Sequence, residues 1–485
     1  MNNFTDKFKE TGVVSFIRHK YGEILDADSY KLSHSEVYSP NATWMMSYLE
    51  SRGGLFKNTV WVGLQLLLLE YFSSTLTHDQ IDNLKAFALA HGEPFPEKQF
   101  RKVVDVYNGK FPVIIKSVDE GLVVPVSNVL LTIESSVDDH DVMSLVSYFE
   151  TKLMRVWYPT TVATLAYNMK LIGLKHLSKT TENPNDYIGF FVNDFSSRGT
   201  TDLNGSIFGG IGHLANFMGS DNIPAVLATM EAYDSPSPVA FSIRATEHSI
   251  MSSQGKDGEE LVFKRLLECW GDTSDMFACV ADTYDIYNFC NVILANNKER
   301  ILNMKAKLVV RPDSGVPNVM VIEVLEMLGN IFGTAINSKG YKVLNPKVSV
   351  IYGDGMSIDT IDEMFDVIVE NGWCVSNVVT GVGGKLAQDV NRDTQKFAIK
   401  CSSMKYDDEY KDVFKQPITA SFKKSKAGRL VLLKDTDGKY ITTTLEKWGE
   451  QYPHIKEQEL KIRYKDGEFL NLTSFDEVRK NTGLW

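Results

Sequence analysis

The 485-residue sequence contains only five cysteines, and no two of them are spaced as CxxC. An odd number of scattered cysteines argues against a disulfide framework or a structural zinc site, and it is typical of a reducing compartment. The N-terminal segment MNNFTDKFKE has no apolar signal core, and no run of about 18 apolar residues occurs that would cross a membrane. We therefore expect a cytoplasmic protein without a membrane partner. The cysteines are Cys269, Cys279, Cys290, Cys374 and Cys401.

Positive charge is also scarce, with 51 Lys and Arg against 62 Asp and Glu, which gives a formal net charge of −11 at pH 7. Such a chain is a poor candidate for binding nucleic acid or anionic membranes. The sequence lacks GxxxxGK[ST], GxGxxG after a strand, and HExxH, so neither a P-loop, a dinucleotide fingerprint nor that type of zinc centre is expected. The hydrophobic fraction of 43% is that of an ordinary globular protein.

The middle of the chain contains short apolar runs, each of which ends in charged residues or glycine and is followed by helix-like sequence. Continuous apolar strands that alternate with helices indicate a parallel sheet covered on both faces. Six or seven such units within about 220 residues favour a closed β/α barrel over an open doubly wound sheet. The runs lie at 187–199, 239–248, 276–285, 307–315, 347–355 and 375–384.

The two ends of the chain differ from this middle. Residues 111–133 are rich in Val and Ile with Gly and Pro between them, which predicts consecutive antiparallel strands. Residues 429–434 and 439–444 are strand-like pieces within a polar C-terminal part. The α/β fold that we expect is a barrel domain with a mixed α/β side domain formed from both ends of the chain. The expected boundaries are 1–155 for the first part of the side domain, 156–400 for the barrel and 401–485 for the segment that rejoins the side domain.

In a β/α barrel, the polar residues that follow the strands gather at one mouth. Two neighbouring glycine turns, IYGDG and GVGG, are typical of a phosphate site late in such a barrel, because glycine lets backbone N–H groups approach the anion. A plain turn is the alternative for either motif alone. The residues expected to converge are Asp194, Arg198, His248, Asp282, Arg311, Asp313, Gly353, Asp354, Gly383 and Gly384.

The motif RPDSG places a cation and a carboxylate two residues apart. Arg311 has the planar donors that bind a phosphate through two hydrogen bonds. Asp313 can bind ribose hydroxyls or Mg²⁺, and Asp354 of GDG is a second carboxylate of this kind. An ion pair on a surface turn is the alternative interpretation. Together, these motifs predict a phosphorylated sugar that is held by its phosphate and by its diol.

Two further motifs end barrel strands. TEHS carries His248, which can act as an acid, a nucleophile or a phosphate contact, with Asp282 as the partner that orients its ring. In NDFSSRG, Phe195 can stack on a flat ring while Arg198 holds an anion. A structural histidine and a packed phenylalanine are the alternatives, and DSYK at 28–31 is compatible with chance composition.

In their order and spacing, these motifs resemble the nicotinamide phosphoribosyltransferase family, in the nicotinate/nicotinamide branch of the type II phosphoribosyltransferases. The resemblance extends from about residue 20 to about residue 480 and includes WYPTTVAT, GGIGHLANFMGSD, DTYDIYN and NSKGYK. It implies a homodimer with an atypical seven-stranded β/α barrel and active sites shared between the subunits. It also implies an enzyme of NAD biosynthesis that transfers the phosphoribosyl group of 5-phosphoribosyl 1-diphosphate to nicotinamide, giving nicotinamide mononucleotide and pyrophosphate.

The resemblance assigns substrate contacts to single residues. The nicotinamide ring would lie between Phe195 and Tyr30 of the partner subunit, and Asp221 would accept the carboxamide N–H₂. Contacts to the diphosphate and the 5′-phosphate are implied for Arg198, His248, Arg311, Gly383 and Gly384, and across the dimer interface for Arg392, Lys400 and Arg52. Ribose contacts are implied for Asp313, Gly353 and Asp354.

The resemblance further implies that Mg²⁺ neutralises the pyrophosphate beside Asp282 and Asp313. With His248, these two residues form the expected catalytic group. ATP is implied as a coupled substrate that phosphorylates His248.

Two alternatives remain open, namely a nicotinate phosphoribosyltransferase and a non-enzymatic dimeric binding protein on the same fold. Asp221 argues against the first, because a carboxylate there repels the carboxylate of nicotinate. The intact Arg311 and His248 argue against the second. The chain departs from the family at Ala398, where a serine is common beside the phosphates, and at Arg244, where a proline is usual near the nicotinamide tunnel.

Overall fold

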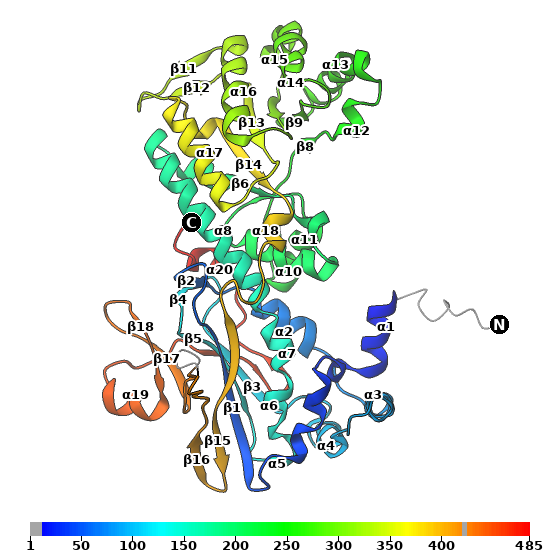
Figure 1. The fold of residues 1–485 in the computed structure, drawn as a ribbon, viewed down its shortest axis with the longest axis vertical. Coiled ribbons are helices and arrows are strands. Elements are labelled where there is room, and N and C mark those ends of the chain that lie inside the picture. The colour runs from blue at the N-terminus through cyan, green and yellow to red at the C-terminus, as the bar shows by residue number, and fades with distance from the viewer. Residues whose placement is uncertain (1–11, 420–423) are drawn as a thin grey trace, which may run out of the picture. The chain divides into compact units, whose positions relative to one another are not determined.

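The computed structural model describes residues 12–419 and 424–485, in two units. Residues 1–11, in which no signal core was found, lie outside the described residues. One unit combines the chain up to Thr161 with Asn391–Gly483 and Trp485, and the other consists of Val162–Val390 with Leu484. In Figure 1, the strands of the unit Val162–Val390 are coloured green to yellow, and the unit formed from both ends of the chain is blue, cyan, orange and red.

The unit formed by Val162–Val390 contains seven parallel strands in the order β7-β6-β14-β13-β10-β9-β8 (Figure 1). The two edges of this sheet meet through Phe241, whose N–H donates to the Met218 carbonyl (2.7 Å) and whose carbonyl accepts from Ser220 N–H (3.0 Å). The expected seven-stranded barrel is therefore confirmed. The strands are β6 (Val192–Asp194), β7 (Gly219–Ser220), β8 (Arg244–Ala245), β9 (Met276–Val280), β10 (Lys307–Arg311), β13 (Val348–Tyr352) and β14 (Val378–Val382).

The barrel strands at 276–280, 307–311, 348–352 and 378–382 are largely apolar because both of their faces are buried. Ala278, Val309 and Ile351 form an interior cluster, and the partly buried Phe195 and Val379 pack on it. The helices and short strands between the barrel strands are α8 (Trp157–Thr180), α9 (Asn185–Ile188), α10 (Leu203–Leu214), α11 (Ile223–Ala232), α12 (His248–Met251), α13 (Glu259–Trp270), α14 (Ile286–Asn288), α15 (Lys298–Asn303), α16 (Pro317–Phe332), β11 (Thr334–Ile336), β12 (Lys342–Leu344), α17 (Ile358–Glu370) and α18 (Gly384–Gln388).

The other unit is built on a seven-stranded antiparallel sheet that joins segments far apart in the sequence (Figure 1). β1 lies between β5 and β15, and β3 pairs with β19, so both ends of the chain build one mixed α/β unit as expected. The order is β16 (Glu409–Asp412), β15 (Phe397–Tyr406), β1 (Ala42–Ser51), β5 (Val129–Ser135), β3 (Val113–Ser117), β19 (Lys461–Lys465) and β20 (Glu468–Phe469).

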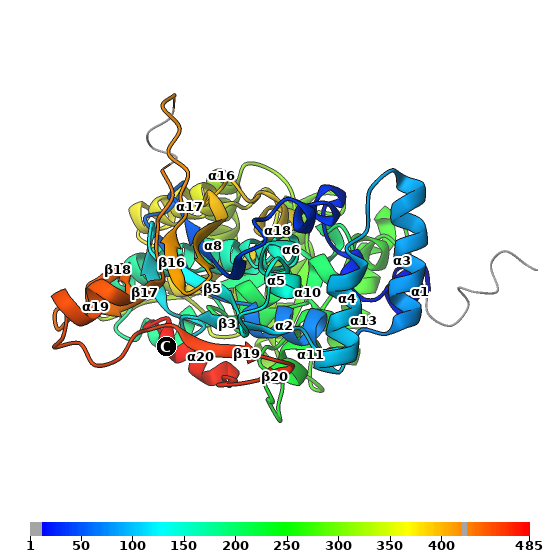
Figure 2. The same ribbon diagram turned by 90° about the horizontal axis from the view of Figure 1, so that it is seen from below.

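Two small sheets and several helices complete this unit. The strand-like pieces predicted in the polar C-terminal part form the hairpin of β17 (Leu430–Lys434) and β18 (Tyr440–Thr444). Figure 2 shows α1 beside α3. Among the described residues, no helix is both long and apolar enough to span a membrane. The remaining elements are α1 (Gly12–Tyr21), β2 (Asn58–Val60), α2 (Leu64–Phe72), α3 (His78–His91), α4 (Glu97–Tyr107), β4 (Val123–Pro125), α5 (His140–Met143), α6 (Leu145–Tyr148), α7 (Glu150–Met154), α19 (Leu445–Gln451) and α20 (Phe475–Asn481).

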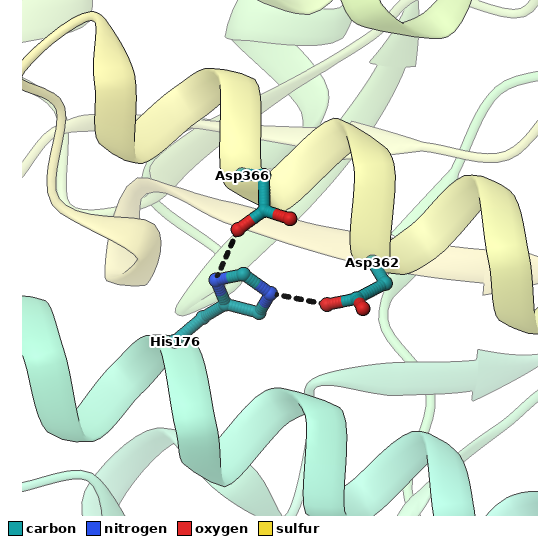
Figure 3. A group of neighbouring side chains, drawn as sticks. All are labelled: His176, Asp362 and Asp366. Atoms are coloured by element: carbon teal, nitrogen blue, oxygen red, sulfur yellow. Dashed lines mark hydrogen bonds and ion pairs between the residues drawn. The ribbon is translucent and has the colours of Figure 1, made fainter.

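A buried histidine connects α8 to α17 (Figure 3). The Nε2 of His176 lies 2.6 Å from Asp362 Oδ1, and its Nδ1 lies 3.9 Å from Asp366 Oδ1. Lys175 Nζ pairs with Asp362 at 2.8 Å. Burial of Asp362 opposes its ionisation, but the hydrogen bonds from Lys175 and His176 prevail and lower the pKa of Asp362. Because the ring nitrogens face different carboxylates and Lys175 neutralises them, we interpret this group as an interhelical contact rather than a metal site.

Replacing Asp362 by alanine tests this contact. We expect the free energy of unfolding to fall by about 1–3 kcal/mol, because a buried ring nitrogen loses its partner. Asp366→Ala removes a more exposed carboxylate and should change it by about 0.5 kcal/mol or less. Since the pKa of Asp362 is lowered on folding, the stabilisation should disappear as the pH falls below about 4. Urea unfolding at neutral and acidic pH measures these effects, and equal losses in both variants would contradict this role.

Candidate active site

The carboxyl ends of all seven barrel strands open on one pocket of about 650 Å³. This volume is typical of a site for a small molecule. Most of the barrel residues that the sequence predicted line it, and Asp282, Asp354 and Gly384 directly adjoin lining residues. The lining consists of Asp194, Phe195, Ser197, Arg198, Asp221, Glu247, His248, Ser249, Val280, Arg311, Asp313, Gly353 and Gly383.

The ring of Phe195 is held in place at the floor of the pocket. Its backbone N–H donates to the Val382 carbonyl (3.0 Å), and its ring packs on the interior cluster of the barrel. A Cβ atom on Gly381 would lie 2.0 Å from this ring, so the ring occupies the space that only glycine leaves free. The guanidinium of Arg311 lies 5.7 Å from the ring centroid. A fixed aromatic ring in a pocket is suited to stacking on a flat ligand.

Arg311, Asp313, His248 and Asp282 form one connected group. Arg311 Nη2 donates to Asp313 Oδ1 at 2.6 Å, and the Asp313 N–H donates to Asp282 Oδ2 at 3.0 Å. His248 Nε2 lies 3.5 Å from Asp313 Oδ2 and 4.0 Å from Asp282 Oδ1. The ring is half-exposed, and its Nδ1 lies 3.2 Å from Thr283 Oγ1. The structure therefore brings together the three residues that were expected to be catalytic.

Burial leaves two polar atoms of this group unpaired within the described residues. Asp282 Oδ1 has no hydrogen-bond donor, and Arg311 Nε has no acceptor. A buried polar atom without a partner costs about 1–3 kcal/mol, so such atoms favour a ligand that pairs with them. Arg311 Nε requires an anion or another acceptor. Asp282 Oδ1 together with Asp313 offers the hard oxygen ligands that Mg²⁺ takes while it keeps several waters.

Tyr352, at the end of β13, holds the loop that contains Asp313. Its hydroxyl donates to the carbonyls of Ser314 and Gly315, each at 3.2 Å. Burial and the nearby carboxylates, which include Asp354 and Asp313, raise the pKa of Tyr352 to about 12. The phenol thus remains a donor throughout the neutral range.

Asp221 follows β7 and is exposed to the pocket. Its N–H donates to the carbonyl of Asp194 (3.0 Å), and its Oδ1 accepts a hydrogen bond of 2.5 Å from Ser242 Oγ. This arrangement fixes the carboxylate as an acceptor beside the Phe195 loop. It is suited to a ligand that donates an N–H and opposed to one that carries a negative charge.

The glycine turn after β14 packs against the loop after β6. A Cβ atom on Gly199 would lie 2.8 Å from the Cα of Gly384, so this close contact requires glycine and brings Arg198 beside the turn. A Cβ atom on Gly383 would meet nothing within 4 Å. The space beside Gly383 is therefore open, as an approaching phosphate requires.

Four predicted contacts, Tyr30, Arg52, Arg392 and Lys400, belong to the other unit. The ring of Tyr30 is 52% exposed, and Arg392 is also exposed. Burial is the main cause that lowers the pKa of Lys400. Attraction to Glu150 opposes this shift, and repulsion from Arg52, Lys415 and Lys31 adds to it. These cations therefore form a cluster that favours an anionic ligand. Of the two departures from the family, Ala398 lies in β15, and Arg244 in β8 donates to Thr273 Oγ1 at 2.8 Å.

Three polar lining residues had no predicted role, namely Ser197, Glu247 and Ser249. Ser249 Oγ donates to Glu247 Oε1. Each of the three is adjacent in sequence to Arg198 or His248, and this adjacency is the signal by which they could have been found.

Comparison with known proteins gives matches along most of the chain. Residues 190–468 match the model of the nicotinate phosphoribosyltransferase (NAPRTase) family, and residues 23–115 match that of the nicotinamide phosphoribosyltransferase N-terminal domain. A curated nicotinamide phosphoribosyltransferase from Xanthomonas campestris is 40% identical, with 94% of this chain and 97% of that protein covered. One from Mycoplasma pneumoniae is 33% identical, with 84% and 94% covered.

Two solved structures share the fold. Nicotinate-nucleotide pyrophosphorylase from Pyrococcus furiosus has a TM-score of 0.60 at 14% identity, with 96% of this chain and 95% of that chain covered. Human nicotinic acid phosphoribosyltransferase has a TM-score of 0.58 at 15% identity, with 94% and 93% covered. At these identities the likeness concerns the fold alone.

Two glycines at the end of β14, Gly381 within the strand and Gly383 in the turn after it, should respond differently to alanine. Gly381→Ala should lower the free energy of unfolding by about 1–3 kcal/mol, because the new methyl group collides with the fixed Phe195 ring. Gly383→Ala, whose methyl group meets open space, should change it by about 0.5 kcal/mol or less. Urea unfolding of both variants checks this, and an equal effect at the two positions would refute the packing described for Phe195.

Proposed function

The chain belongs to the nicotinate phosphoribosyltransferase family, and on that basis we propose that it transfers the phosphoribosyl group of 5-phosphoribosyl 1-diphosphate to nicotinamide in NAD biosynthesis. The products are nicotinamide mononucleotide and pyrophosphate. The observation that carries this proposal is the convergence of Phe195, Asp221 and the Arg311–Asp313 pair on one pocket. Similarity to curated nicotinamide phosphoribosyltransferases over most of the chain supports it.

The transfer step breaks the bond between ribose C1′ and the diphosphate and forms a bond to the ring nitrogen of nicotinamide. Departure of the diphosphate leaves an oxocarbenium-like ribose, so the protein must stabilise a leaving polyanion. Arg198 and Arg311 lie where they can do this, and Asp313 can hold the ribose hydroxyls. Phe195 and Asp221 orient the nicotinamide so that its ring nitrogen faces C1′. The ring nitrogen is a neutral nucleophile, and the step therefore needs no strong base.

Asp282 and Asp313 are the residues that would hold Mg²⁺. When bound there, the ion would neutralise charge on the diphosphate. Support for this assignment comes from the unpaired Asp282 Oδ1 and from the hydrogen bond between the Asp313 N–H and Asp282 Oδ2.

We also propose a homodimer in the cytoplasm, in which each subunit completes the site of the other. Tyr30, Arg52, Arg392 and Lys400 would reach the ring and the phosphates of the partner's substrate. The cation cluster around Lys400 supports this proposal, because anionic phosphates would relieve its internal repulsion. The five free cysteines fit a reducing cytoplasm.

ATP is proposed as a coupled substrate. The terminal phosphoryl group would pass from ATP to an imidazole nitrogen of His248, releasing ADP, and water would later release phosphate from the ring. The half-exposed position of His248 in the pocket, beside Asp313, supports this role.

Asp221→Asn tests the choice of pyridine substrate. We expect kcat/KM for nicotinamide to fall about tenfold or more, since the carboxylate acceptor is lost. The preference over nicotinate should shrink, because the like-charge repulsion disappears as well. Asp275→Asn, at an exposed carboxylate before β9, is the control and should leave both values unchanged. Mass spectrometry of the mononucleotide products measures this, and a preserved preference in Asp221→Asn would exclude the role of this carboxylate.

His248→Ala separates ATP coupling from transfer. ATP hydrolysis during turnover should fall to background, while mononucleotide formation without ATP should remain measurable. Phosphate release and product formation are measured in the same reactions. If ATP hydrolysis were unchanged, the phosphate acceptor would have to be another group.

Mixed dimers test the shared sites. Asp313→Ala and Lys400→Ala should each be nearly inactive as homodimers. When the two chains are co-expressed with different tags, half of the dimers pair both variants and contain one complete site. The mixture should regain about a quarter of wild-type activity. Absence of any recovery would show that each subunit works alone.

A further inference from the structure

We infer that Asn222 is a positioning residue that fixes the separation between Asp221 and Phe195 and thereby sets the affinity for nicotinamide. This inference rests on the proposed function. Asn222 directly follows Asp221 and is the N-cap residue of α11, and no family motif pointed to it. Its side chain does not line the pocket, so it acts through its neighbours.

The amide of Asn222 uses its whole hydrogen-bonding capacity. Its Nδ2 donates to Asp194 Oδ2 (3.2 Å) and to the Ser206 carbonyl (3.0 Å). Its Oδ1 accepts from Ser206 Oγ (2.9 Å) and from the Ala225 N–H (3.2 Å). Two donors and two acceptors are the most that an amide offers. Asn222 and Asp194 are both 0% exposed, so water cannot replace any of these bonds.

Asp194, which Asn222 holds in place, is hydrogen-bonded to the backbone on both sides of the nicotinamide site. Its Oδ1 accepts a hydrogen bond of 2.8 Å from the N–H of Ser196, which is the first residue after Phe195. Its backbone carbonyl accepts from the Asp221 N–H at 3.0 Å. The backbone next to the Phe195 ring and the backbone of Asp221 are therefore held by the same buried residue, Asp194. Asn222, which lies after β7, in turn holds the side chain of Asp194.

Close packing prevents the amide from turning away. A Cβ atom on Gly210 of α10 would lie 2.7 Å from Asn222 Nδ2 and 2.3 Å from the Ala225 Cβ. Only glycine allows α10 to pack this closely. Ser206, on the same helix, also connects to the Phe195 loop, because its Oγ lies 2.9 Å from Ser197 Oγ. The network thus has one arrangement rather than several.

An amide, and not a carboxylate, is required at position 222. In Asn222→Asp, which keeps the shape, an oxygen would face Asp194 Oδ2 at the 3.2 Å now spanned by a hydrogen bond. Two like charges buried at this distance repel strongly, so the two loops would separate. The contacts that Arg311 and Asp313 make to the diphosphate and the ribose should change less, because these two residues follow a different strand, whereas Arg198 lies in the same loop as Phe195.

The test is steady-state kinetics of Asn222→Asp with wild type. We expect KM for nicotinamide to rise about tenfold or more, while kcat at saturation and KM for 5-phosphoribosyl 1-diphosphate change about threefold or less. Asn377→Asp is the matched control. Asn377 is 5% exposed and donates to two carbonyls, of Lys342 and Cys374, at the amino end of the barrel. It should lower the melting temperature without changing either KM.

Two further variants keep the inference testable if Asn222→Asp does not fold. The double variant Asp194→Asn/Asn222→Asp restores a donor opposite an acceptor at the contact with residue 194 but not at the Ser206 carbonyl, so its KM for nicotinamide should fall clearly below that of Asn222→Asp without reaching the wild-type value. Ser206→Ala removes one donor to Asn222 and should raise this KM about two- to fivefold. An unchanged KM in Asn222→Asp, or in Ser206→Ala if the former is insoluble, would overturn the inference. A wild-type protein that makes no mononucleotide would instead refute the proposed function.

Discussion

The parallel pairing of seven strands into a closed ring is the constraint on which the site depends. Because all strands run in one direction, their carboxyl ends meet at one mouth, and residues from Phe195 to Gly383 become neighbours. Closure itself depends on a short contact, in which Phe241 exchanges backbone hydrogen bonds with β7. Without it, Asp221 and His248 would lie at opposite edges of an open sheet.

The acidic net charge and the anionic substrate are compatible because affinity for a small polyanion depends on local placement. The net charge of −11 describes the whole chain, whereas Arg198, Arg311 and the open glycine turn face one pocket. Asp221 and Asp313 line the same pocket, and Asp282 adjoins it through its hydrogen bond with the Asp313 N–H. Carboxylates in such a position are suited to ligand groups that donate hydrogen bonds and to a divalent cation.

Much of the barrel could be predicted from the sequence, because β9, β10, β13 and β14 are apolar runs with a polar end. β7 was not among the predicted strands, because a strand of two residues, Gly219 and Ser220, is too short to show a sequence pattern. Site residues beside glycine turns or charged motifs could likewise be predicted from the sequence. Asn222 was not, because its role comes from hydrogen bonds to β6 and α10, which spacing along the chain does not reveal.

Transfer of the phosphoribosyl group to nicotinamide at the mouth of the barrel can be measured directly. The most direct measurement incubates the purified full-length protein with 5-phosphoribosyl 1-diphosphate, Mg²⁺ and either nicotinamide, nicotinate or quinolinate, with and without ATP. Products are quantified by mass spectrometry. We expect nicotinamide mononucleotide as the main product, at a kcat/KM for nicotinamide well above that for nicotinate. Equal or faster conversion of nicotinate, or no mononucleotide from any of the three, would contradict it.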